Sequence, residues 1–181
     1  REVVRVITPG TVTAAEALDA RGNNFLAAAW KGPNGLGLAL TDITTGEFRF
    51  TEIADEAALF DELGRIHPSE LLLASRDGRL RERLYREYPL IHFSVIADEL
   101  FDDGAQSRIR ADAEAQASIE GLRAASAILG YLDANASESL KLIGALEPYH
   151  LSSYLVLDET TRVNLGLTVN YQGDRRGSLL A

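Results

Sequence analysis

Acidic side chains are the groups in this sequence that could bring metal ions to a reaction. They are Asp55, Glu56, Asp61 and Glu62 on one predicted helix, and Asp77 after a short apolar run. Two metal ions clamped between carboxylates can cleave a phosphodiester, but such a cluster also needs an acid on the first strand of the sheet. The first long apolar run, residues 24–30, contains no carboxylate. A nuclease of this kind is therefore only the alternative interpretation.

The other reactive side chains form no recognisable site. His67, His92 and His150 are far apart and lack the spacing of metal ligands. The glycine-rich run 32–37 links two predicted strands and precedes no helix, so it matches neither a dinucleotide-binding loop nor a phosphate-binding loop. We therefore predict no catalytic, cofactor-binding or metal-binding residue in this chain.

The composition is that of a soluble globular protein with an acidic balance. The chain has 181 residues, with 18 Lys and Arg against 27 Asp and Glu, and a formal net charge of −9. Contacts to nucleic-acid phosphates need clustered basic side chains, so we predict that the chain does not bind nucleic acid by itself. Cysteine is absent, which excludes disulfides and fits a reducing cytoplasm. No apolar run approaches the roughly 20 residues that span a bilayer.

Hydrophobic patterning in the first third of the chain predicts an antiparallel meander of three strands. The predicted strands are 24–30, 36–43 and 47–53, preceded by a strand at 2–8 and a helical turn at 14–20. The first strand is almost wholly apolar, which is typical of a strand covered on both faces. Phe48 and Phe50 alternate with polar neighbours, so the third strand is predicted to have one wet face.

The hydrophobic period then changes, and helices alternate with short strands. The predicted helices are 55–66, 77–88 and 96–101, and the predicted strands between them are 70–74 and 90–95. A loop at 102–110, a long alanine-rich helix at 111–134 and a linker at 135–140 follow. A meander followed by strand–helix crossovers gives a mixed sheet with helices packed on it. The predicted fold class is therefore α/β.

The stretch 154–167 is predicted to be a short buried strand that leads into a helix. Asp158 is well placed as the N-cap, because its carboxylate can accept the free backbone N–H groups of the first turn. Val163 and Leu167 fall four residues apart on one face of that helix. By pattern alone this is a capped helix of an ordinary globular protein.

The residue types of this stretch are more specific than its pattern. Asp158, Thr161, Arg162, Asn164 and Leu165 form a run that is followed by Gly-Asp-Arg-Arg-Gly-Ser-Leu-Leu at 173–180. This combination resembles the start of the core, or lever, domain of the bacterial mismatch-repair MutS family. Shorter runs at 3–11, 23–27, 42–48, 68–72 and 129–132 resemble further family motifs, in the same order.

The resemblance implies a fold and a division of the chain. Residues 1–148 would be the connector domain, whose fold in the family is RNase H-like, and residues 149–181 would be the incomplete start of the core domain. Because the chain begins at Arg1 and contains no methionine, we expect it to be a piece of a longer protein. The five motif residues from Asp158 to Leu165 would then have a structural role.

The resemblance also implies a function for the fragment. A connector links the mismatch-reading domain to the core and offers a docking surface for the MutL partner protein. The fragment itself is expected to be non-catalytic, since ATP, magnesium and mismatched DNA bind other domains of the parent. The parent is expected to be a cytoplasmic, nucleoid-associated homodimer with no membrane segment. The alternatives are an RNase H-like nuclease and a generic α/β interaction module.

Partner contacts are expected on the predicted helix 96–101. Its apolar residues, Ile96, Leu100 and Phe101, are predicted to face the sheet. Asp98 and Glu99 then face water, and they are the candidate residues for binding a MutL-type protein. The alternative is that they only make the surface soluble.

Overall fold

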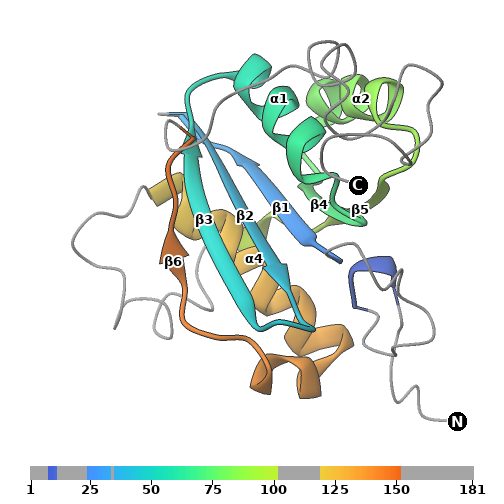
Figure 1. Cartoon of the computed structure of the whole chain (residues 1–181). Coiled ribbons are helices and arrows are strands. Elements are labelled where there is room, and N and C mark those ends of the chain that lie inside the picture. Colours follow the sequence, from blue (N-terminus) through green and yellow to red (C-terminus); the bar gives the residue numbers. More distant parts are fainter. Residues whose placement is uncertain (1–7, 12–23, 34, 102–118, 152–181) are drawn as a thin grey trace, which may run out of the picture.

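The computed structural model describes residues 8–11, 24–33, 35–101 and 119–151. Within these residues the chain forms one six-stranded sheet with the strand order β5-β4-β1-β2-β3-β6 (Figure 1). The strands are β1 (Leu26–Lys31), β2 (Leu36–Asp42), β3 (Glu47–Ile53), β4 (Glu70–Ala74), β5 (His92–Ile96) and β6 (Glu147–Pro148).

The sheet is mixed, as the sequence predicts. β1, β2 and β3 form an antiparallel meander. β4 pairs parallel with β1, and β5 pairs parallel with β4. The short strand β6 pairs parallel with β3 and closes the other edge. The predicted α/β class is confirmed, whereas the RNase H-like assignment stays a prediction from the resemblance.

Three α-helices cover the two faces of the sheet in the described part of the chain. They are α1 (Glu56–Ile66), α2 (Gly78–Glu87) and α4 (Ile119–Asn135). α1 begins after Asp55, whose carboxylate accepts the N–H of Ala58 at 2.8 Å, and ends at His67 in the left-handed conformation (φ 46°). α1 and α2 lie on one face and α4 lies across the other (Figure 1).

Strand β1 supplies side chains to both hydrophobic cores. Leu26, Ala28 and Trp30 pack on the side of α4. Ala27 and Ala29 pack on the side of α1 and α2. Successive side chains of a strand point to opposite faces, so a strand between two helical layers must be apolar throughout. This confirms the predicted strand that is covered on both faces.

Helix α4 lies unusually close to the sheet because two glycines meet there. A Cβ atom on Gly37 of β2 would lie 1.9 Å from the carbonyl oxygen of Glu120. A Cβ atom on Gly121 of α4 would lie 2.7 Å from the ring of Phe50. The backbone of α4 therefore rests directly on β2 and β3, where no side chain fits.

Four short elements differ from the predictions. The predicted helix 96–101 is a 3-10 helix, η2 (Asp98–Phe101), because Ile96 still belongs to β5. The predicted linker 135–140 overlaps a further 3-10 helix, η3 (Ser137–Lys141), and a third one, η1 (Pro9–Thr11), follows the predicted strand 2–8. Two residues, 147 and 148, form the unpredicted β6, a run too short to show a strand period.

Several predicted features lie outside the described residues. They are most of the strand at 2–8, the helical turn at 14–20, the whole loop 102–110, the part of the predicted long helix before Ile119, and the strand–helix unit at 154–167. The motif residues Asp158, Thr161, Arg162, Asn164 and Leu165 are among them.

Candidate functional site

The carboxyl ends of β1 and β4 are the place where an open α/β sheet usually binds a ligand. Here β1 ends at Lys31, whose ammonium lies 2.8 Å from the carboxylate of Glu56 at the start of α1. Arg83 of α2 forms a second ion pair with the same carboxylate. The hydrogen bond from Lys31 is the main reason that the pKa of Glu56 is lowered. Glu56 is therefore held as an anion between two cations.

Of the remaining acids of the nuclease hypothesis, Asp77 is close enough to Glu56 for the two charges to interact. Burial raises the pKa of Asp77, and the neighbouring Arg76 and Lys31 oppose that rise. Asp55 caps α1, and Glu62 accepts two hydrogen bonds from Arg65 on the same helix. Among the described residues, no three His, Asp or Glu side chains lie together as metal ligands.

Trp30 is the buried centre of this end of the sheet. Its ring stacks on Phe101 of η2 with centroids 4.8 Å apart, and its indole N–H donates to Glu120 of α4 at 2.9 Å. The guanidinium of Arg76 lies 3.8 Å from the ring centroid. A cation over an indole face is attracted by the ring quadrupole. Trp30 therefore joins β1, η2, α4 and the turn after β4.

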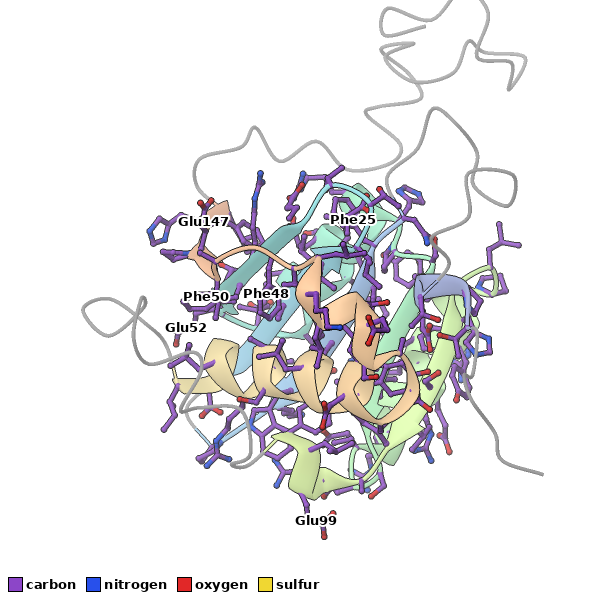
Figure 2. The ribbon with its side chains drawn as sticks, turned by 90° about the horizontal axis from the view of Figure 1, so that it is seen from below. Phe25, Phe48, Phe50, Glu52, Glu99 and Glu147 are labelled. Carbon is purple, nitrogen blue, oxygen red and sulfur yellow. The ribbon has the colours of Figure 1, made fainter. Side chains whose placement is uncertain are left out.

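The two candidate partner contacts have different surroundings. The carboxylate of Asp98 accepts hydrogen bonds from the hydroxyl of Ser75 at 2.9 Å and from the backbone N–H of Arg76 at 3.3 Å. Glu99 is exposed, and Figure 2 shows it projecting from the opposite side of the molecule to Glu147. Asp98 therefore fastens η2 to the turn after β4, and Glu99 is the freer of the two.

The predicted inward residues of this segment do face the sheet. Phe101 is fully buried, and Ile96 packs against the core on the α4 side. Leu100 lies against Gly130 of α4, where a Cβ atom would come 2.9 Å from a leucine methyl group. The prediction of which residues point inward is confirmed, although the segment is not an α-helix.

The amino ends of the same strands hold a fully buried carboxylate, Glu70. It accepts hydrogen bonds from the backbone N–H of Gly10 at 3.0 Å, from the hydroxyl of Ser94 at 2.6 Å and from the hydroxyl of Tyr131 at 2.8 Å. Burial raises the pKa of Tyr131, which keeps this phenol a donor. Glu70 thereby fastens η1, β5 and α4 to the start of β4.

A second buried carboxylate lies at the same end of the sheet. Asp42, at the end of β2, accepts the N–H of Asn24 at 3.1 Å, and its other oxygen accepts the N–H and the hydroxyl of Thr44. The side-chain amide of Asn24 donates to the carbonyl of Pro9 at 2.9 Å. Residues 8–11 are therefore held at this end by two separate hydrogen bonds.

The last described residues are also fastened to the sheet. The N–H of Tyr149 donates to the carbonyl of Phe50 at 2.9 Å, and its hydroxyl donates to Glu62 at 2.9 Å. The ring is buried in the core under α1 and α2. Tyr149 thus packs with the sheet, while the predicted division of the chain into 1–148 and 149–181 stays a prediction.

The comparisons with known proteins identify the family. A family model described as MutS domain II matches residues 24–144. The chain belongs to this family. It is 39% identical over 201 residues to the DNA mismatch repair protein MutS of Acaryochloris marina, covering 99% of the chain and 23% of that relative. It is 37% identical over 200 residues to MutS of Thermosynechococcus vestitus, with the same two coverages of 99% and 23%.

The MutS domain II chain therefore spans about a quarter of the length of these relatives. A third relative, MutS of Rhodopseudomonas palustris, is 37% identical over 99% of the chain and 21% of its own length. The predicted resemblance to the MutS family is confirmed. No helix in the described residues is long and apolar enough to cross a membrane.

Sequence reasoning missed the buried polar residues that fasten the elements together. Glu70 was predicted only as the first residue of a buried strand, and Glu120 only as part of a long helix. A charged residue inside an apolar run is a signal that could have indicated a hydrogen-bonded carboxylate. Nothing in the sequence indicates which donors meet it, because Gly10 and Tyr131 lie 60 and 61 residues away.

Proposed function

We propose that the chain is a rigid connecting domain of a MutS-type mismatch-repair protein. It joins the mismatch-reading part of the parent to the core and offers a docking surface to a MutL-type protein. The chemical work of the parent, including ATP hydrolysis with magnesium, would belong to other domains. The chain itself would take no catalytic part.

The observation that supports this proposal is that both ends of the described chain are fastened to one sheet. Residues 8–11 are held through Gly10 by the buried Glu70. Residues 149–151 are held through Tyr149 by the buried Glu62 and by the backbone of Phe50. Hydrogen bonds to buried carboxylates are strong and directional. A domain fastened in this way transmits the movement of one neighbour to the other.

The non-catalytic part of the proposal is supported by the carboxyl end of the sheet. Glu56 and Asp98 each lie within ion-pair distance of arginine or lysine. A carboxylate whose negative charge is already neutralised by a lysine or an arginine attracts a metal ion only weakly. Purified chain incubated with duplex DNA or RNA and magnesium or manganese should show no cleavage. Cleavage that is lost in Glu56→Gln would contradict this part.

The docking proposal is tested at Glu99, because the carboxylate of Asp98 already accepts hydrogen bonds from Ser75 and Arg76. The variant Glu99→Lys should weaken capture of the N-terminal region of the cognate MutL-type protein by roughly three- to tenfold, as for a charge near the rim of an interface. Glu52→Lys is the matched control, since Glu52 is exposed on β3 at a different side of the molecule (Figure 2). Equal affinities for both variants would show that η2 is not part of the docking surface.

A further inference from the structure

The outer edge of β5 has no neighbouring strand in the part of the chain that the structure describes. On its inner side, the N–H of His92 donates to the carbonyl of Ser69 at 3.1 Å, and the carbonyl of Ile96 accepts the N–H of Ser75 at 3.2 Å. In a parallel strand, the backbone groups of successive residues point alternately to the two sides, so every second residue after His92 faces away from β4. Phe93 and Val95 therefore present N–H and C=O groups on the open edge.

Apolar side chains gather beside this edge. The described residues include five exposed large hydrophobic side chains, and three of them, Tyr85, Leu90 and Val95, are here. Tyr85 of α2 packs edge-on against the ring of Phe93 with centroids 4.5 Å apart. Leu90 is 98% exposed and Val95 46% exposed. Single exposed apolar residues need no explanation, but a group of them beside free backbone donors indicates an interaction site.

The two edges of the sheet differ in how they are protected. On the other edge, β6 has only two residues, and one of them is Pro148, which has no N–H to offer. β5 has five residues with no proline, lysine, arginine or carboxylate among them. Natural proteins shield an edge with such residues when it must not pair. The edge of β5 has none of this protection.

The charge beside β5 favours an acidic partner. Helix α2, which packs on β5 through Tyr85, has four arginines and two glutamates. Arg79 and Arg86 are exposed, and within the described residues neither has an ion-pair partner. A carboxylate on an incoming segment would meet this excess of positive charge.

We propose that an extended, acidic segment of the docking protein adds to the sheet as a seventh strand along β5. Its backbone would pair with Phe93 and Val95, and its alternate apolar side chains would pack on Tyr85 and Val95. Strand addition of this kind takes affinity from backbone hydrogen bonds and specificity from alternate side chains. The inference rests on the proposed function, because η2 with Glu99 follows β5 directly.

Val95→Pro tests the backbone contact, with Val95→Thr as the matched control. Proline at this position removes an N–H that points outward, so the ladder to β4 is kept, whereas threonine keeps the N–H and the branched shape. The probe is the N-terminal region of the cognate MutL-type protein, titrated against the chain of 181 residues. We expect Val95→Pro to weaken binding by at least about tenfold and Val95→Thr by less than about threefold.

Hydrogen exchange in the unmodified chain gives an independent readout that does not depend on how the proline variant folds. On complex formation, the amides of Phe93 and Val95 should exchange at least about tenfold more slowly, while His92, already bonded to Ser69, should change little. Binding without this slowing, or equal binding by both variants, would overturn strand addition and leave docking intact. Absence of any binding by the unmodified chain would overturn the proposed function and this inference together.

Discussion

The two ends of the central strands place their carboxylates in different surroundings. At the amino end, Glu70 is fully buried and its partners are a backbone N–H and two hydroxyls. At the carboxyl end, Glu56 is partly exposed and its partners are Lys31 and Arg83. Burial removes water as an alternative partner, so Glu70 depends wholly on its three donors. The comparison predicts large effects at the first end and small effects at the second.

The largest effect is expected for Glu70→Ala. Three donors would be left buried without an acceptor, and we expect a loss of about 3 kcal/mol in the free energy of unfolding. Urea unfolding followed by the fluorescence of Trp30, the single tryptophan, measures it. Glu70→Gln keeps one oxygen for the hydroxyls and should cost about half as much. Equal losses for the two variants would show that side-chain volume, not hydrogen bonding, matters at this position.

A smaller loss in the free energy of unfolding is expected for Glu120→Ala. This variant separates the effect of burial from the effect of position in the sheet. Glu120 lies at the carboxyl end of β1 but is buried, and it accepts the indole N–H of Trp30. A buried N–H left without an acceptor lowers the free energy of unfolding by about 2 kcal/mol. The fluorescence emission of Trp30 should shift as well. Glu120→Gln, which keeps an acceptor, is the control. A loss below about 0.5 kcal/mol would mean that position in the sheet, not burial, sets the cost.

Asp77→Asn should stabilise the chain at neutral pH by up to about 1 kcal/mol. Burial raises the pKa of Asp77 in the folded state, so the folded chain binds a proton more readily than the unfolded chain. The contribution of Asp77 to the stability of the chain is therefore lost as the pH rises through its pKa in the folded state. Asparagine has no charge to bury, and the side chain of Asp77 makes no cap hydrogen bond to α2 that the change would remove. The gain should disappear at acid pH, where both residues are neutral; a gain that persists there would contradict this cause.

The smallest effect is expected for Glu56→Gln, and its pH dependence should have the opposite sign. The pKa of Glu56 is lowered in the folded state, mainly by Lys31. Its stabilising contribution is therefore present at neutral pH and is lost as the pH falls through the folded pKa. An exposed ion pair contributes about 0.5 kcal/mol or less. Stability curves of native chain and variant should converge on acidification, and raised salt should reduce their difference at neutral pH.

The sequence by itself determined the features that depend on neighbouring residues. The apolar run of β1 predicted a strand covered on both faces, and the five residues of β4 were predicted with their bounds. Asp55 was placed at the start of α1, where it caps the helix. The alternating period of a strand, the period of a helix and the hydrogen bonds of a cap all act within about four residues. Family motifs act over similarly short runs, so the family could also be recognised.

Only the tertiary structure decided which distant groups meet. Glu70 could be assigned to a strand, but its three donors come from η1, β5 and α4. Glu120 meets Trp30 across 90 residues, and Tyr149 meets Glu62 across 87. The edge of β5, which is open within the described residues, likewise follows from the strand order. A strand's sequence does not state how many neighbours the strand has. Such contacts depend on the packing of whole elements, which no local period encodes.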